Sequence, residues 1–200
     1  MALLRRTGDG SVVSQTEAIY RWRRLDGLTL EVLRLHLHND AGARASSRLV
    51  DASPEPFALD YEWELDRQWR TRRVSIRTDL PDRSALEIAR VGEASWRVNG
   101  ASRPDLDGCD EVDLSVTPFC NTLMIKRLAL APGSVTEASA LYVPFPELTS
   151  VPSWQRYERL DATTVRYVDL GAVLGFQATL TLDEDGFVRT YEDLFERVEP

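Results

Sequence analysis

Two histidines lie at a spacing that can hold a metal ion. His36 and His38 are two residues apart in a leucine-rich run, so both rings point to one side of the predicted strand. A metal site needs a third and a fourth ligand, and the sequence holds no other histidine. Asp40 or a distant carboxylate would have to complete it. We therefore expect no metal or cofactor, and expect both histidines to face solvent opposite Leu35 and Leu37.

A second pattern resembles the start of a calcium loop. Asp183, Asp185 and Gly186 have the opening spacing, and Glu192 is a distant candidate ligand. The full loop needs a third acidic position before the glycine and a fixed spacing to the final glutamate, and neither is present. A hairpin turn between two strands accounts for the run.

Glu62 and Glu64 flank Trp63, and paired carboxylates beside an aromatic side chain suggest glycoside hydrolysis. Five apolar residues at strict period two favour another interpretation, in which residues 57–65 form a strand and the glutamates are its solvent face. The sequence also has no G-x-S-x-G elbow and no phosphate-binding glycine loop. We therefore expect no catalytic residues, and favour a protein that is not an enzyme.

The polar residues Asn121 and Thr122 lie in a segment that otherwise predicts burial. Thr117 followed by Pro118 is a favourable N-cap and first helical position. Apolar side chains then follow on every side of the helix: Phe119, Cys120, Leu123, Met124, Ile125 and Leu128. A helix that is apolar nearly all round is buried. Asn121 and Thr122 then either bond to a surrounding sheet or meet a ligand in a cavity, and we favour the sheet.

The rest of the chain predicts a dozen or more strands at the spacing typical of sandwiches and barrels. Asp26-Gly27 predicts a hairpin turn, and residues 1–15 a loose or partly paired lead-in. The apolar phase shifts after Leu28, Leu30 and Val32, which predicts a β-bulge near Val32 or a strand buried on both faces. In such a chain we expect a sheet that curls around the buried helix.

Composition narrows the function classes. The 200 residues are enough for one domain, and 24 basic against 32 acidic residues give a net charge of −8. This charge argues against nucleic-acid binding and against docking on anionic lipids. No stretch predicts a secretory signal or a transmembrane helix, so we expect a soluble cytoplasmic protein without stable membrane insertion. The two cysteines, Cys109 and Cys120, are interpreted as buried thiols.

Four segments, at residues 21–35, 109–128, 155–160 and 175–188, resemble the bacterial "putative glycolipid-binding" family, which has a spiral β-roll fold. Residues 112–128, VDLSVTPFCNTLMIKRL, are the most specific part, although Met124 stands where a proline is expected. The resemblance implies a mainly β fold with about fifteen mostly antiparallel strands around one helix near residues 117–128. It also implies a homodimer and a glycolipid or long apolar ligand, and it supplies no catalytic residues.

We therefore expect a non-catalytic binding or carrier protein for a lipid-like ligand. The candidate ligand contacts comprise four aromatic residues for the lining and three polar residues for a polar head: Trp22, Trp63, Phe119, Tyr157, Asn121, Lys126 and Arg127. The alternatives are an enzyme for a small hydrophobic substrate, with a carboxylate or histidine of shifted pKa in a cleft, and a protein–protein interaction module. The first hypothesis requires a cavity of several hundred Å³ beside the packed helix.

Overall fold

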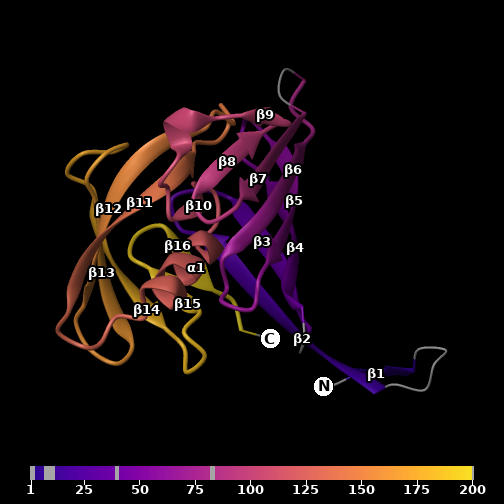
Figure 1. The fold of residues 1–200 in the computed structure, drawn as a ribbon, viewed down its shortest axis with the longest axis horizontal. Coiled ribbons are helices and arrows are strands. Elements are labelled where there is room, and N and C mark those ends of the chain that lie inside the picture. The colour runs from indigo at the N-terminus through magenta and orange to yellow at the C-terminus, as the bar shows by residue number, and fades with distance from the viewer. Residues whose placement is uncertain (1–2, 7–11, 39–40, 82–83, 200) are drawn as a thin grey trace.

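The computed structural model describes residues 3–6, 12–38, 41–81 and 84–199 of the protein. Its strands form one 16-stranded sheet with the order β10-β11-β12-β13-β14-β15-β16-β2-β3-β4-β5-β6-β7-β8-β9, and β1 pairs with β2 off this path. The β10–β11 pair is parallel, and the other pairs are antiparallel, as in β2–β3 and β12–β13. The predicted fold class is confirmed, because this sheet lies on both sides of one short helix (Figure 1).

The sheet has two halves joined by the pairing of β16 with β2. The first half comprises β1 (Leu3–Arg6), β2 (Val12–Arg24), β3 (Thr29–His38), β4 (Gly42–Asp51), β5 (Phe57–Leu65), β6 (Thr71–Thr78), β7 (Ala85–Val91), β8 (Ser95–Val98) and β9 (Ala101–Ser102). A 3₁₀ turn, η1 (Pro104–Leu106), follows β9. The second half comprises β10 (Glu111–Leu114), β11 (Val135–Val143), β12 (Val151–Arg159), β13 (Thr164–Asp169), β14 (Gln177–Leu182), β15 (Val188–Tyr191) and β16 (Phe195–Arg197).

The helix α1 (Phe119–Leu128) connects β10 to β11 and lies between the two halves (Figure 1). Thr117 and Pro118 were predicted as the N-cap and the first helical residue, but α1 begins one residue later, with Pro118 at the N-cap position. The Thr117 hydroxyl still accepts the Phe119 backbone N–H, at 3.2 Å. All residues from Phe119 to Ile125 are buried, as the apolar circumference indicated. Met124, which stands where a proline is expected in the family, lies inside the helix, and the helix continues to Leu128. Ala129 ends it in the left-handed conformation, with its N–H bonded to the Ile125 carbonyl.

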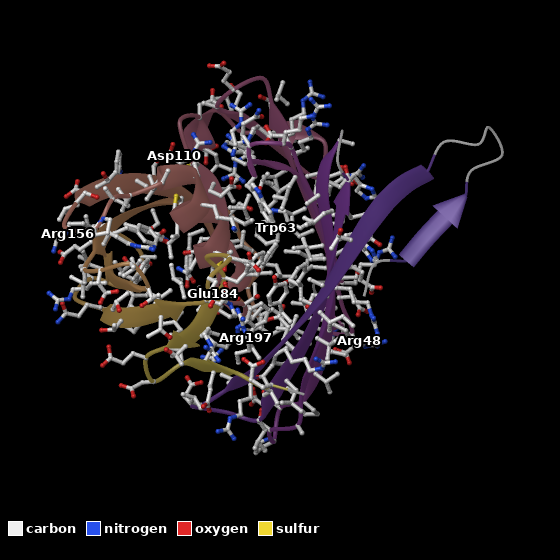
Figure 2. All side chains as sticks on the ribbon, turned by 90° about the horizontal axis from the view of Figure 1, so that it is seen from below. Arg48, Trp63, Asp110, Arg156, Glu184 and Arg197 are labelled. Carbon is white, nitrogen blue, oxygen red and sulfur yellow. The ribbon has the colours of Figure 1, made fainter. Side chains whose placement is uncertain are left out.

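Strand β5 shows why alternation is a good guide in this chain. Leu59, Tyr61, Trp63 and Leu65 are buried, and the residues between them are exposed. Figure 2 shows the Trp63 side chain among those that fill the space between the two half-sheets. Glu62 forms an ion pair with Arg44 across the strands, so the glutamates do form the solvent face.

Strand β3 departs from the prediction. Its register with β2 and β4 is continuous, so there is no bulge near Val32, and the strand is not buried on both faces. Leu30 and Val32 are exposed, whereas the polar residues Thr29 and Glu31 point inward. These two polar side chains can be buried because partners on other strands bond to them, as described below.

Two other sequence expectations have clear outcomes. Residues 1–15 were predicted to be loose or partly paired, and the described part is paired: β1 lies antiparallel to β2, which begins at Val12. The Asp183–Gly186 run is a turn between β14 and β15, in which the Asp183 carboxylate accepts the Phe187 N–H at 2.8 Å. The predicted hairpin turn therefore accounts for that acidic run.

The core falls into two clusters, one on each side of α1. The first cluster contains the large residues Trp22, Trp63 and Trp96 with Phe119 and Leu123 of the helix. The second contains Met124 and Ile125 of the helix, and three tyrosines of the second half-sheet: Tyr157, Tyr167 and Tyr191. The helix therefore contributes apolar side chains to both halves, and this makes it the common packing surface of the fold.

Candidate functional site

A pocket of about 400 Å³ lies at the N-terminal end of α1. Its lining comes from β2, β10, α1, β11, β13, β15 and β16, and from the loops after β10, β11, β13 and β15, so both halves contribute. Six of the lining residues are aromatic and two are acidic. The lining residues are Arg24, Asp113, Leu114, Ser115, Thr117, Asn121, Tyr142, Phe145, Tyr167, Asp169, Val173, Phe176, Tyr191, Leu194 and Phe195.

Other hollows of similar volume have a different character. One of about 350 Å³ is formed largely by charged side chains on the outer faces of β4, β5 and β6, including Arg44, Glu62 and Arg73. These three residues are exposed, and two of them form an ion pair. Since ligand sites combine apolar walls with a few placed polar groups, the pocket at the start of α1 is the better candidate.

Asp113 on β10 is the first acidic residue of the pocket. Its Oδ1 accepts the Cys120 thiol at 3.0 Å, and its Oδ2 accepts the Gln155 side-chain amide. Burial raises the pKa of Asp113, and these two hydrogen bonds oppose the rise, while the neighbouring Asp169 carboxylate adds to it. Both wall contacts are donors, so the geometry presents Asp113 as a hydrogen-bond acceptor.

Asn121 on α1 is buried and lines the same pocket. Its amide nitrogen donates to the Tyr157 hydroxyl at 3.3 Å, and that hydroxyl donates to the Gln155 carbonyl oxygen at 3.0 Å. Gln155 in turn bonds to Asp113. A continuous polar chain therefore links the helix to the sheet, as the structural interpretation of Asn121 required, and the same residue also faces the pocket.

Asp169 at the end of β13 is the second acidic residue. It accepts the Tyr167 hydroxyl at 3.2 Å and the backbone N–H groups of Gly171 and Val173 at 2.8 and 3.0 Å. This carboxylate therefore holds the loop that carries Val173 at the pocket. Gly171 allows the close approach, because a Cβ there would be 2.7 Å from the Ser153 hydroxyl oxygen.

Arg24 is the cationic residue of the lining. Its guanidinium bonds to both carboxylate oxygens of Asp26, the second at 2.9 Å, and lies over the Phe195 ring at 5.7 Å from the centroid. Because Asp26 neutralises Arg24 locally, the two acidic side chains dominate the charge of the pocket.

A further buried carboxylate lies beside the helix start. The Glu31 Oε1 accepts the Ser47 and Tyr61 hydroxyls at 2.7 and 2.6 Å, while Oε2 has no partner among the described residues. The Tyr61 hydroxyl is also 3.3 Å from the Thr117 hydroxyl. Burial raises the pKa of Glu31 to about 7. Glu31 does not line the pocket, but through Tyr61 it contacts Thr117, whose hydroxyl accepts the N–H of the first residue of α1.

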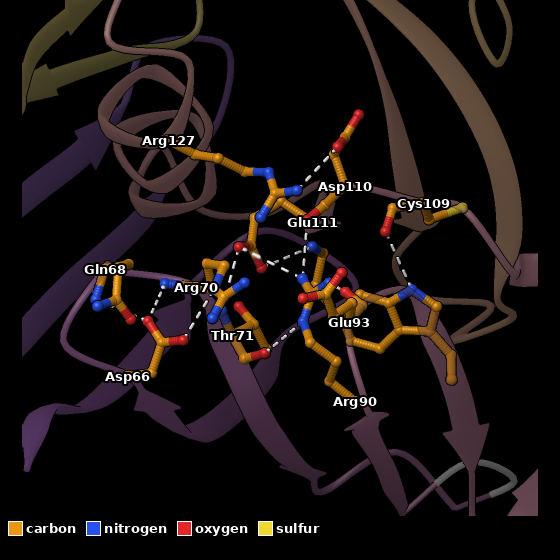
Figure 3. Close-up of polar contacts among 12 residues, drawn as sticks. Asp66, Gln68, Arg70, Thr71, Arg90, Glu93, Cys109, Asp110, Glu111 and Arg127 are labelled. Carbon is orange, nitrogen blue, oxygen red and sulfur yellow. Dashed lines mark hydrogen bonds and ion pairs between the residues drawn. The ribbon is translucent and has the colours of Figure 1, made fainter.

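A cluster of polar contacts surrounds the buried side chains of Arg90 and Glu111 (Figure 3). The Arg90 guanidinium donates to the backbone carbonyls of Thr71, Glu93 and Asp110, and lies 3.7 Å from the Glu111 carboxylate. Its charge also lies over the Trp96 ring at 4.2 Å. With these partners inside the fold, the cluster is a structural connection between β6, β7 and β10.

The sequence-predicted contact residues fall in different places. Only Asn121 lines the pocket. Trp22, Trp63, Phe119 and Tyr157 are fully buried core residues, and the two indole N–H groups donate to Val188 and Thr71. Their role as ligand contacts stays a prediction.

The two basic candidates at the end of α1 also lie away from the pocket. The Lys126 ammonium contacts the faces of Trp69 and Phe187, at 4.6 and 4.7 Å from the ring centroids. The Arg127 guanidinium donates to the Asp110 carboxylate at 3.0 Å. Both side chains therefore have protein partners.

Asp113, Asp169 and the tyrosines Tyr142, Tyr167 and Tyr191 are pocket residues that sequence reasoning missed. One signal was present for Asp169, because it continues the inward phase of Val165 and Tyr167 on β13. An acidic residue at an apolar phase is a candidate for a built site. For Asp113 no equivalent alternation exists on the short strand β10.

The described residues hold neither a metal-ligand cluster nor a helix that could span a membrane. Among the residues that the structure describes, no three His, Cys, Asp or Glu side chains come together as a metal ion would require. His36 and His38 are half-buried at the end of β3, and Asp40 lies outside the described residues. Within the same described ranges, no helix has both the length and the hydropathy that a membrane crossing needs.

Comparison with known proteins shows the family of the chain. Residues 19–197 match the model of the family described as "Putative glycolipid-binding". The chain belongs to this family. No functionally curated protein matches it.

One solved structure is similar to the chain over most of its length. The crystal structure of a DUF1089 family protein from Pseudomonas aeruginosa is 30% identical, covers 92% of each chain and superposes with a TM-score of 0.72. A β-barrel-like protein of the DUF1849 domain from Brucella abortus is 11% identical over 94% of this chain and 96% of that one, with a TM-score of 0.47, which is too low to carry an argument.

Proposed function

We propose that the protein binds an amphipathic, glycolipid-like ligand, without catalysis, and that the pocket at the start of α1 holds part of that ligand. The observation that carries the proposal is the cavity itself. The sequence hypothesis required several hundred Å³ beside the packed helix, and about 400 Å³ is present. Its lining combines apolar and aromatic walls with the polar groups of Asp113, Asn121 and Asp169.

Family membership supports the same proposal. The description of the family names a glycolipid, and the family model spans almost the whole chain. The fold contributes a physical reason, because two half-sheets and a helix start meet at the pocket and hold its walls by hydrogen bonds. Such preorganisation reduces the conformational entropy lost on binding.

The test is binding to the purified protein, with and without a blocked pocket. Native mass spectrometry should detect co-purified amphiphile, and displacement of a fluorescent acyl probe should give its affinity. Val173→Trp places a large side chain at the lining, where Val173 is half exposed. Val135→Trp is the matched control, because Val135 is similarly exposed on β11 and does not line the pocket.

Loss of probe binding in Val173→Trp but not in Val135→Trp supports the proposal. Equal binding by both variants and the native protein would place any ligand elsewhere. The absence of binding across neutral and charged amphiphiles would contradict the proposed function.

One observation favours a second candidate function. The enzyme hypothesis required a carboxylate of shifted pKa in a cleft, and burial raises the pKa of Asp113 in the pocket. Release of nitrophenol from aryl glycosides or esters, abolished by Asp113→Asn, would establish an enzyme. We favour binding because Cys120 and Gln155 both donate to Asp113, which leaves it an acceptor held in the wall.

The homodimer, the single domain and the cytoplasmic location stay predictions.

A further inference from the structure

We infer that the pocket takes an uncharged sugar ring, head first, and rejects anionic headgroups, while the ligand's chain leaves over Val173 and Leu174. This inference rests on the proposed function and adds its direction and its charge selectivity. Three features of the pocket carry it: the balance of charge, the aromatic wall and the apolar rim.

The balance of charge excludes phosphate and sulfate. Asp113 and Asp169 both line the pocket, and their remaining acceptor positions are suited to hydroxyl donors. Among the described residues, Arg24 is the one cationic side chain of the lining, and Asp26 bonds to it with both carboxylate oxygens. A phosphate would therefore meet two carboxylates without a free cation, whereas sugar hydroxyls can donate to both.

The aromatic wall suits the C–H faces of a sugar ring. Tyr167, Phe176 and Tyr191 form a triangle, with centroids 6.0–6.2 Å apart. Phe195 continues it at 6.2 Å from Tyr191. Rings fixed against one another provide a rigid apolar surface beside the polar groups, and this combination both orients a polyol and buries its apolar faces.

The volume sets the direction of entry. Ligand sites for drug-sized molecules span roughly 300–1,000 Å³, so about 400 Å³ is at the small end and holds a headgroup better than a whole lipid. The chain then needs an apolar path outside. Val173 lines the pocket and is 51% exposed, and Leu174 is 78% exposed beside it. The backbone bond from Val173 to Asp169 ties this rim to the acidic end of the site.

The experiment compares amphiphiles that share an octyl chain, by calorimetry below their micelle concentrations. Octyl glucoside should bind at least tenfold more tightly than octyl phosphate. Asp113→Asn removes one of the two negative charges, so it should shrink this ratio at least threefold. Octyl phosphate binding as tightly as the glucoside, or an unchanged ratio in Asp113→Asn, would overturn the inference.

The rim is tested separately. Leu174→Ser should weaken octyl glucoside severalfold and leave methyl glucoside unchanged, because only the octyl compound has a chain to lie on the rim. Leu28→Ser is the matched control, since Leu28 is 62% exposed and lies outside the pocket lining. Equal losses in both variants, or an equal loss for methyl glucoside, would overturn the exit path.

These results distinguish a failure of the proposed function from a failure of the charge selectivity. If no octyl compound binds, or Val173→Trp changes nothing, the proposed function itself fails. If the octyl compounds bind and Val173→Trp blocks them, but the phosphate is preferred, the proposed function stands and the charge selectivity fails.

Discussion

Glu111 and Asp113 are two residues apart on β10, yet their surroundings differ completely. Glu111 is fully buried; its oxygens accept the Thr71 and Val112 N–H groups at 3.1 Å, and Arg90 lies beside it. Asp113 accepts two side-chain donors and faces a pocket. One carboxylate is enclosed by the fold, and the other keeps acceptor positions that a ligand can use.

The difference shows that burial alone does not mark a functional carboxylate in this protein. Burial raises the pKa of both groups, and Arg90 opposes the rise at Glu111. What separates them is whether protein partners surround the group or a cavity lies on one side of it. We expect variants at the enclosed site to change stability, and variants at the pocket to change binding.

The largest effect is expected at the enclosed site. Glu111→Ala should lower the free energy of unfolding by about 3–5 kcal/mol, because it leaves the Arg90 charge buried without its anion. Urea unfolding at neutral pH measures this. Glu196→Ala is the control, since Glu196 pairs with Arg23 at the surface, and its loss should be at most about 1 kcal/mol. Equal losses in the two variants would contradict the contrast.

Glu31 tests an intermediate case, in which one carboxylate oxygen has no partner. Its pKa is about 7 in the folded protein and ordinarily 4.5, so the folded state binds the proton more tightly. The stability contributed by this proton is complete below pH 4.5 and is lost as the pH rises to 7, by roughly 3 kcal/mol. Glu31→Gln should remove this loss. The stability of the variant relative to the native protein should therefore be higher at pH 8 than at pH 4.5. Parallel stability–pH curves for the two proteins would refute the assignment.

The loop that Asp169 holds should be sensitive to a single methyl group. Gly171→Ala brings a Cβ to 2.7 Å from the Ser153 hydroxyl oxygen and 2.9 Å from the Trp154 backbone nitrogen. It should lower the free energy of unfolding by about 1–3 kcal/mol. Thermal and urea unfolding measure the cost. Gly27→Ala is the control, because a Cβ there has only ordinary contacts at 3.8 and 3.9 Å. An unchanged stability in Gly171→Ala would mean that the loop has room to move.

The smallest effect on stability is expected at Asp113. Asp113→Asn keeps the side chain's shape and removes a buried charge. Its carbonyl oxygen can still accept the Gln155 amide, and the Cys120 thiol that would face its amide group also donates to the Thr117 carbonyl at 3.0 Å, so unfolding should change by at most about 1 kcal/mol. Binding of a neutral sugar amphiphile should weaken about tenfold, since a hydrogen bond to a charged group is lost. Calorimetry and urea unfolding on one preparation compare the two effects. A stability loss as large as that of Glu111→Ala would remove the distinction between the two carboxylates.

Much of the fold could be predicted from local patterns. Alternation along Phe57–Leu65 indicated a strand with one buried face, and Thr117-Pro118 indicated where the helix begins. Both signals are local, because side-chain period and capping depend on neighbouring residues. The prediction for strand β3 was wrong because its buried phase depends on distant residues. Its leucine and valine suggested the buried phase, but Glu31 is inside because Ser47 and Tyr61, far along the chain, bond to it.

The sequence by itself was enough to determine a mainly β chain around one buried helix, and to single out Asn121 as a polar group that needs a partner or a ligand. Only the tertiary structure decided that Asn121 has both a partner, Tyr157, and a place in a pocket. It also decided that Asp113 faces this pocket while Glu111 is enclosed. The physical reason is that a carboxylate's free hydrogen-bonding positions depend on donors from distant strands, and those donors come together only when the sheet folds around α1.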